Sequence, residues 1–330
     1  MKKRFITAGI LLLIAFISLI TFIKLDNNTI KNKNLTKIKL AEVTHSAFYA
    51  PLYVAIENGY FEDEGIDLEV ILTPGADKVA SSVLSNDVNI GFAGPESAIY
   101  VYTGGEKDYL KTFAGLTKRD GQFVISRKKD FKLEDLYGKE ILVGRYAGMP
   151  SLNFINALKN NNIDINKIKI NYSVEFAALS GSFISGVGDY VNLFEPNATA
   201  LEKEGYGYVV ESIGKLSGEV PYTAFYCRNS YLNNNKDLLI KFTNAINKGL
   251  KYVKDNSAEK VAEVILPQFP EISKNSLTSI IDRYKKYDSW LENPFITKES
   301  FENLENIMID ANLLDNYVEY DKLIQNLYEK

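Results

Sequence analysis

The polar side chains that could bind or transform a small molecule are concentrated in loops that follow apolar strands. The only histidine, His45, lies in the loop THSAFYAP with Ser46 and Tyr49. A neutral imidazole can hydrogen-bond a ligand or titrate near neutral pH. We expect this loop to border a cleft, where His45 either contacts ligand or makes a hydrogen bond within the loop. Tyr49 and Phe48 could form one aromatic wall, and core packing is the simpler role for Phe48.

Two acidic residues stand where an apolar strand passes into a helix. Gly94 and Glu96 follow the strand VNIGFA, and Glu195 follows YVNLF. Free backbone N–H groups at a helix start suit an anion. An acid in the first turn can instead complement the helix dipole without any ligand. Glu195 could also accept a hydrogen bond from an amino group of a ligand.

Two arginines could bind an anionic ligand. Arg119 lies in TKRDGQF and Arg145 in RYAGMPS. A guanidinium group binds a carboxylate or sulfonate in a bidentate manner, although Arg119 could equally form a salt bridge at a hinge. Ser151 could donate to a ligand oxygen or make a local turn bond. The full set of candidate ligand-binding residues is His45, Ser46, Tyr49, Gly94, Glu96, Arg119, Gln122, Arg145, Met149, Ser151, Glu195 and Tyr222.

The sequence lacks the usual apparatus of several enzyme classes. A single histidine and a single cysteine, Cys227, cannot make a multi-histidine or cysteine metal site. No G-x-S-x-G nucleophile turn is present. These absences do not exclude a metal site built from carboxylates. We predict a protein that is not an enzyme, with no catalytic residue, metal or cofactor, and with Cys227 packed as a small apolar side chain.

The elements that position these residues alternate between strand and helix. IKLAEV predicts a strand, a helix begins near Pro51 and ends near Gly59, and IDLEVIL predicts a second strand. Pro95, Pro150 and Pro196 mark three further changes from strand to helix. This pattern indicates an α/β fold in which helix N-termini gather at one edge of a sheet, where open α/β proteins bind ligands.

The C-terminal third predicts helices without strands. Leu239, Phe242, Ile246 and Leu250 follow helical spacing. Further helices are predicted for AEKVAEVIL, SKNSLTSIIDRYKKY and TKESFENLENIMIDANLL, with Asn256 or Ser257 capping the first and Thr297 the third. We expect these helices to pack on one of the sheets.

The N-terminal segment predicts a membrane anchor or a signal helix over residues 1–24. Lys2, Lys3 and Arg4 precede an uncharged run over 5–23, which at about 1.5 Å per residue is long enough to cross a bilayer. The basic residues favour a cytoplasmic N-terminus and an extracytoplasmic remainder. Because SLITFIKLD has no A-x-A pattern, we favour an uncleaved anchor over a cleaved, secreted form. Residues 25–36 then form a polar tether.

Composition fits an ordered protein of more than one compact unit. The chain has 330 residues, of which 46% are hydrophobic and 24% charged. Without Lys2, Lys3, Arg4 and Lys24, 34 basic residues face 42 acidic ones, a net charge of −8. We therefore expect no binding of nucleic acid, or of an anionic membrane surface, through bulk charge.

An ordered set of motifs resembles a family of known proteins. YAPLYVAIENGYFEDEGIDLEV is followed by PGADKVASSVLSNDVNIGFAGPESAI, LEDLYGKEILVG, FEP and FTNAINKGLKYV. The set resembles the substrate-binding proteins of ABC importers, in the branch that includes nitrate-, sulfonate-, taurine- and thiamine-pyrimidine-binding members. Members from cells with a single membrane usually carry a lipid-anchored cysteine after the apolar run. No cysteine stands there in this chain, so the protein anchor would replace the lipid.

The resemblance implies a type II periplasmic-binding-protein clamp with two lobes. Lobe I would comprise 37–123 and 224–330, and lobe II 124–223, joined by two hinge crossings. A ligand would bind between the lobes, and closure would present a monomeric protein to an ABC permease and its ATPase.

The sequence leaves two classes of ligand possible. Pyrimidine-binding relatives show the pattern H-x-x-x-YVA. When the YVA of this chain is aligned with that pattern, Tyr49, and not His45, takes the place of the histidine. A small organic anion of the sulfonate, taurine or nitrate type therefore ranks slightly ahead of an aminopyrimidine, a thiamine precursor or a related vitamin. A tethered ligand sensor, and an extracellular enzyme on the same fold, are alternative functions. The related pyrimidine synthases use a cysteine-rich iron motif that this chain lacks.

Overall fold

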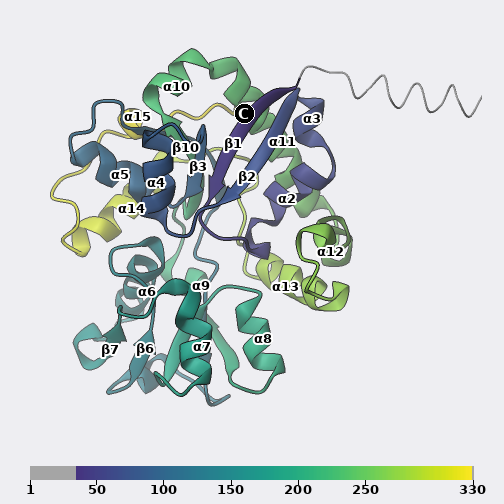
Figure 1. Ribbon diagram of the computed structural model, residues 1–330. Helices are drawn as coiled ribbons and strands as arrows, with labels where there is room; N and C mark the ends of the chain where they lie inside the picture. The colour runs from purple at the N-terminus through teal and green to yellow at the C-terminus, as the bar shows by residue number, and fades with distance from the viewer. Residues whose placement is uncertain (1–34, 329–330) are drawn as a thin grey trace, which may run out of the picture. The chain divides into compact units, whose positions relative to one another are not determined.

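The computed structural model describes residues 35–328, which form two five-stranded sheets. The order is β2-β1-β3-β10-β4 in the first sheet and β7-β6-β8-β5-β9 in the second (Figure 1). The strands are β1 (Thr36–Glu42), β2 (Ile66–Leu72), β3 (Ile90–Ala93), β4 (Leu110–Thr117), β5 (Phe123–Ser126), β6 (Glu140–Leu142), β7 (Lys169–Asn171), β8 (Tyr190–Leu193), β9 (Tyr208–Ser212) and β10 (Thr223–Arg228).

Helices follow most strands and dominate the C-terminal third. The α-helices are α2 (Ala50–Glu57), α3 (Tyr60–Asp63), α4 (Ala76–Leu84), α5 (Glu96–Thr103), α6 (Met149–Asn160), α7 (Leu179–Ile184), α8 (Asn197–Lys203), α9 (Ile213–Ser217), α10 (Asn229–Asn234), α11 (Lys236–Asp255), α12 (Ala258–Ile265), α13 (Lys274–Lys286), α14 (Lys298–Asp310) and α15 (Tyr320–Leu323). Short 3-10 turns include η2 (Ala47–Tyr49) and η6 (Leu266–Gln268).

The local signals predicted from sequence are confirmed in the first βα unit. Pro51 stands in the first turn of α2, where its missing N–H costs no hydrogen bond. Gly59 adopts a left-handed φ of 70° just after α2, which suits a residue without a Cβ. The predicted caps also hold, since the hydroxyls of Ser257 and Thr297 accept from Lys260 N and Ser300 N.

Each sheet contains an antiparallel strand from a distant part of the chain. β1 and β3 are parallel, whereas β10 runs antiparallel between β3 and β4. In the second sheet β5 runs antiparallel to both β8 and β9. We call 36–117 with 223–328 region one and 123–212 region two; the crossings 118–122 and 213–222 join them.

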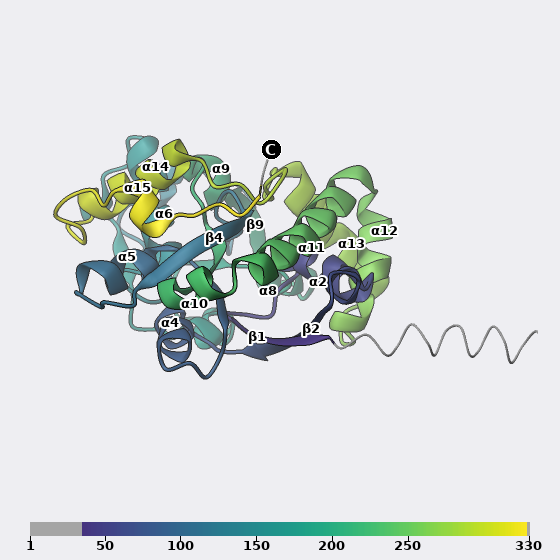
Figure 2. The ribbon, with the colours of Figure 1, turned by 90° about the horizontal axis from the view of Figure 1, so that it is seen from above.

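The C-terminal helices pack on region one, as the sequence predicts. Figure 2 shows α11 beside α2 and β4, and these elements are in contact. α12 in turn contacts α2 and α13. One apolar cluster extends from region one into region two through Met149 and Phe194, and a second cluster, which includes Phe154, fills the other face of region two.

The expected anchor over residues 1–24 and most of the tether over 25–36 lie outside the described residues. Among residues 35–328, none of the helices has the length and apolar character that a membrane span requires.

Candidate ligand-binding site

Eight buried side chains carry polar atoms that lack a hydrogen-bond partner among the described residues: Glu96, Thr112, Arg119, Asp120, Gln122, Asn192, Tyr222 and Tyr226. We call five of them, Glu96, Asp120, Gln122, Asn192 and Tyr222, the unpartnered cluster. Each is at most 4% exposed. Buried polar atoms in folded proteins are nearly always hydrogen-bonded, so a group of unpartnered ones indicates a place for a ligand.

Both regions and both crossings contribute to this cluster. Glu96 begins α5 in region one, and Asn192 lies in β8 of region two. Asp120 and Gln122 belong to the first crossing, and Tyr222 ends the second. The sequence positions are far apart, but the crossings bring them to the junction of the two sheets.

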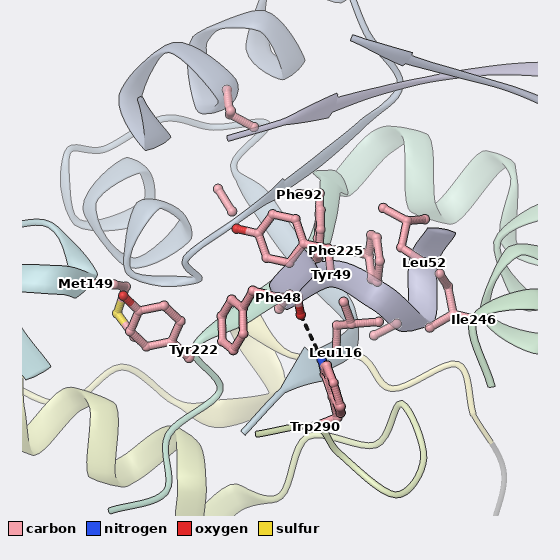
Figure 3. Close-up of a cluster of buried hydrophobic side chains, with 14 of the residues drawn as sticks. Phe48, Tyr49, Leu52, Phe92, Leu116, Met149, Tyr222, Phe225, Ile246 and Trp290 are labelled. Carbon is pink, nitrogen blue, oxygen red and sulfur yellow. Dashed lines mark hydrogen bonds between the residues drawn. The ribbon is translucent and has the colours of Figure 1, made fainter. Parts of the chain in front are cut away.

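Aromatic rings surround the unpartnered cluster. The Phe48 ring centroid lies 5.5 Å from that of Phe194 and 5.9 Å from that of Tyr222. Tyr49 packs edge-on against Phe92 at 4.4 Å. Figure 3 draws Met149, Tyr222 and Phe48 together, with the dashed hydrogen bond from Trp290 Nε1 to the Phe48 carbonyl, 2.7 Å long. These rings suit the faces of a flat, partly apolar ligand.

Glu96 is held in a tight and poorly solvated place. A Cβ on Gly94 would lie 2.0 Å from Glu96 Oε2 and 2.5 Å from Met149 Cγ, so only glycine fits between the two regions there. Burial raises the pKa of Glu96 to about 7, although backbone N–H groups of Glu96, Met149 and Ser97 oppose that rise. Glu96 can therefore change charge near neutral pH.

Asp120 and Tyr222 face each other across the crossings. Burial raises the pKa of the Asp120 carboxyl, and burial with the Asp120 charge raises the pKa of the Tyr222 hydroxyl. Asp120 Oδ1 accepts from Gln122 N at 2.7 Å, which leaves Asp120 Oδ2 and the Tyr222 hydroxyl without a hydrogen bond of good geometry. The Asp120 carboxyl and the Tyr222 hydroxyl interact with each other, and neither of these two atoms has another partner among the described residues.

Gln122 and Asn192 are neighbours whose amide groups are largely free. Gln122 Nε2 lies 3.5 Å from the backbone carbonyl oxygen of Asn192, a long contact. Gln122 Oε1 and both polar atoms of the Asn192 side chain lack partners among the described residues. Together they offer acceptors and a donor on one side of the cluster.

A model of the NMT1/THI5-like family matches residues 47–260. The chain belongs to the NMT1/THI5-like family. It is 41% identical over 297 residues to YtlA of Bacillus subtilis (strain 168), which is named as a binding protein, with 89% of each chain covered. It is 19% identical over 299 residues to the formylaminopyrimidine-binding protein of Halalkalibacterium halodurans, which covers 78% of this chain and 87% of that protein.

Solved structures show the same fold at low identity. The alkanesulfonate-binding protein SsuA of Xanthomonas axonopodis pv. citri, bound to MOPS, gives a TM-score of 0.69 at 12% identity, over 88% of this chain and 98% of that one. The nitrate-binding protein NrtA of Synechocystis PCC 6803 gives 0.66 at 15% identity, over 88% and 86%. The fold of this NMT1/THI5-like chain is therefore the two-sheet α/β fold of the periplasmic binding proteins.

In this NMT1/THI5-like chain His45 is held by the protein itself. Its Nδ1 lies 2.8 Å from Glu42 Oε1, and its Nε2 lies 2.9 Å from the Gln268 carbonyl. The hydrogen bond with Glu42 raises the pKa of His45. Both ring nitrogens face protein acceptors, so this arrangement corresponds to the alternative in which His45 completes the loop.

The two arginines form ion pairs outside the unpartnered cluster, although the buried Nε of Arg119 has no hydrogen-bond partner among the described residues. Arg119 Nη2 lies 2.8 Å from Glu219 Oε1 and 3.4 Å from Asp288 Oδ2, in a network beside the crossings. Arg145 Nη1 lies 2.5 Å from Asp77 Oδ1, and both side chains are more than half exposed. Neither guanidinium group hydrogen-bonds a member of the unpartnered cluster.

The remaining predicted residues divide between local bonds and contacts between the regions. Ser151 Oγ donates to the Gly148 carbonyl within the start of α6, at 3.1 Å. Ser46 Oγ donates to the Glu195 carbonyl at 2.7 Å and accepts from Phe48 N at 3.2 Å. The Glu195 carboxylate accepts from Thr199 N at 2.9 Å, in the first turn of α8.

Asn192 and Asp120 were absent from the predicted set, although the structure places both in the unpartnered cluster. A single amide in the apolar strand YVNLF, and an acid beside glycine in RDGQ, are weak signals because most such residues face solvent. Their burial depends on the second sheet and the crossings, which a local pattern does not encode.

Proposed function

We propose that this chain is the solute-binding component of an ABC importer, and that it binds a small planar ligand rich in N–H groups, of the aminopyrimidine class. Three acceptor atoms without partners carry the proposal: Glu96 Oε2, Asp120 Oδ2 and Gln122 Oε1. N–H groups on a ligand would satisfy these acceptors, and the rings of Phe48, Phe194 and Tyr222 would cover its faces.

The charges at the site favour this class over the anion that the sequence ranks first. An anion would be buried beside Glu96 and Asp120, and wherever either carboxyl group is ionised the anion would meet a like charge at a large cost in free energy. Arg145, one of the expected anion ligands, pairs with Asp77, and Arg119 pairs through Nη2 with Glu219, although its buried Nε has no partner among the described residues. The alignment with the formylaminopyrimidine-binding protein supports the same ligand class.

In this proposal the two regions act as lobes I and II, with bounds 37–123 and 224–330 for the first and 124–223 for the second. The ligand would enter when the lobes part at the crossings and be enclosed when they close. The protein would act outside the cytoplasm as a monomer, held at the membrane by residues 1–24, and would deliver its ligand to a permease and an ATPase.

Ligand-dependent thermal unfolding of the full chain tests the ligand class. The panel holds 4-amino-2-methylpyrimidine, thiamine, taurine, an alkanesulfonate and nitrate. A ligand at 100 times its dissociation constant should add about 2.7 kcal/mol to the free energy of unfolding. We expect stabilisation by the aminopyrimidines, and stabilisation by the anions alone would refute the ligand class.

Two matched variants and a pH series sharpen this test. Glu96→Gln should weaken aminopyrimidine binding roughly 30-fold, because a hydrogen bond to a charged group is worth about 2 kcal/mol. Lys139→Ala should leave binding within about twofold, since its ion pair with Asp189 is exposed. After correction for the ligand's own titration, affinity should rise from pH 6 to pH 8 as Glu96 loses its proton. An anion would show the opposite slope.

A further inference from the structure

Glu195 lies at the contact between the two regions, and its polar atoms are saturated. Its backbone N–H donates to the Tyr284 hydroxyl at 3.1 Å, and its carbonyl accepts from Ser46 Oγ at 2.7 Å. Its carboxylate accepts from Thr199 and from Arg283 Nη1, the latter at 2.5 Å. Tyr284, Ser46 and Arg283 belong to region one, whereas Glu195 belongs to region two. One residue of region two therefore has three partners in region one.

The Arg283 side chain spans two acids of region two. Its Nη1 bonds Glu195 Oε1 and lies 3.3 Å from Thr199 Oγ1, and its Nη2 lies 3.0 Å from Glu202 Oε2. The Glu195 side chain is fully buried, while the Arg283 side chain is 23% exposed. The planar guanidinium fork matches this pair of acceptors, which a lysine could not reach together.

The same contact is connected to the ligand-binding rings. Phe194, the neighbour of Glu195, packs against Phe48 at 5.5 Å. Ser46 also accepts from Phe48 N, and the Tyr284 ring lies 5.1 Å from the Phe48 ring. The residues that hold Glu195 are thus the residues that hold Phe48, so a change at this contact alters the position of a ring beside the unpartnered cluster.

We infer that Arg283 is a positioning residue for ligand binding: it does not touch the ligand, but it holds Glu195 against region one and so brings together the ligand-facing side chains of both regions. The Arg283 bonds to Glu195 and Glu202 exist only while the regions are in contact. They therefore favour the closed arrangement over any opened one, and a ligand that binds the closed arrangement gains affinity from them. The affinity part of this inference rests on the proposed function, whereas the closure part does not.

The test compares closure and affinity in full-length variants. Small-angle X-ray scattering without ligand measures the radius of gyration, and calorimetry with 4-amino-2-methylpyrimidine measures affinity. Arg283→Ala should increase the radius of gyration and weaken the probe at least tenfold. Arg283→Lys should recover only part of the affinity, because it restores the charge without the fork. An Arg283→Ala protein with the wild-type radius of gyration would overturn the inference, even if the probe bound to no variant.

A matched control and a second variant separate closure from folding. Lys203 Nζ reaches Ser276 Oγ at 2.6 Å between the same helices, α8 and α13, but at an exposed position. Lys203→Ala should keep the wild-type radius and affinity, and an expansion equal to that of Arg283→Ala would contradict a specific role for Arg283. If Arg283→Ala alone fails to fold, the double variant Arg283→Ala with Glu195→Gln removes the unpaired buried charge. That variant should fold and still be expanded, and a wild-type radius in it would overturn the inference.

Discussion

Glu96 and Glu195 occupy comparable places in the two sheets but differ in what surrounds them. Glu96 follows β3 and Glu195 follows β8, and each stands next to a proline at the start of a helix. Every polar atom of Glu195 has a partner, whereas Glu96 Oε2 has none among the described residues. Burial raises the pKa of both carboxyl groups; Arg283 opposes that rise at Glu195, whereas backbone N–H groups and Arg145 oppose it at Glu96.

The difference separates two uses of a buried acid. A carboxylate that is buried together with its donors fixes the position of neighbouring elements. A buried carboxyl that keeps one oxygen without a donor destabilises the free protein, and a donor from a ligand would relieve that cost. The first description fits Glu195 at the contact between regions, and the second fits Glu96 in the unpartnered cluster.

Removing the saturated acid should have the largest effect. Glu195→Ala should lower the free energy of unfolding by about 3 kcal/mol, because it breaks a buried ion pair and leaves Thr199 N and Arg283 Nη1 without their carboxylate acceptor. Urea denaturation at pH 7 measures this loss. Glu202→Ala is the control, since Glu202 is more exposed and should cost less than about 1 kcal/mol. Equal losses in the two variants would contradict the distinction.

The unpartnered acid should reveal itself through pH. The pKa of Glu96 is raised to about 7 in the folded protein from 4.5 in the unfolded chain, so the folded state binds more protons between these values. The ligand-free protein should therefore gain about 2 kcal/mol of stability as the pH is lowered from 8 to 5.5. Glu96→Gln should remove most of this gain. A residual slope of the same sign should persist, because the pKa values of Asp120, Glu195 and His45 are also raised.

The packing around Glu96 should tolerate no added atom. Gly94→Ala places a Cβ against Glu96 and Met149, and should destabilise the protein by about 1.5 kcal/mol, as overpacked cores usually do. Gly181→Ala in α7 is the matched change, because nothing lies within 4 Å of its added Cβ. Thermal unfolding should show a lower midpoint for the first variant and an unchanged or higher one for the second. A similar fall in both would mean that Gly94 has no special role between the regions.

Replacing His45 should destabilise the protein for the same reason as replacing Glu195, but by a smaller amount. His45→Gln should reduce stability by about 1 kcal/mol at pH 6, through loss of the bond to Glu42. Because the pKa of His45 is raised, this contribution is present at pH values below the pKa of the folded histidine, and it should decline as the pH rises to 8. Affinity for 4-amino-2-methylpyrimidine should stay within about twofold. A large loss of affinity would place His45 in the ligand site.

Local signals predicted the fold well because they act through neighbouring residues. The proline at the start of α2, Gly59 after it and the cap of α12 by Ser257 each depend on a few adjacent positions. The strand IDLEVIL is predicted with equal ease, but its apolar Leu72 is 54% exposed, at the end of the edge strand β2. Strand order is a property of the whole sheet, and the pattern of one strand does not contain it.

The site was harder to predict because it depends on which polar groups are left over. Ser151, Arg145 and His45 have suitable chemistry, yet each finds a partner within the protein. Glu96, Gln122 and Tyr222 keep free atoms after the chain has folded. Whether an atom is left over depends on every neighbour across two regions, so residue type alone could not separate these groups.

The placement of β10 has a consequence for how the protein is made. β3 and β4 do not pair with each other; β10 lies between them, and Phe225 stacks on Phe92 at 4.3 Å. This sheet cannot be completed until residues 223–228 are available, whereas 123–212 is one continuous stretch with a second apolar cluster of its own. We therefore expect the middle segment to fold before β1, β3 and β4, although those strands precede it in the chain.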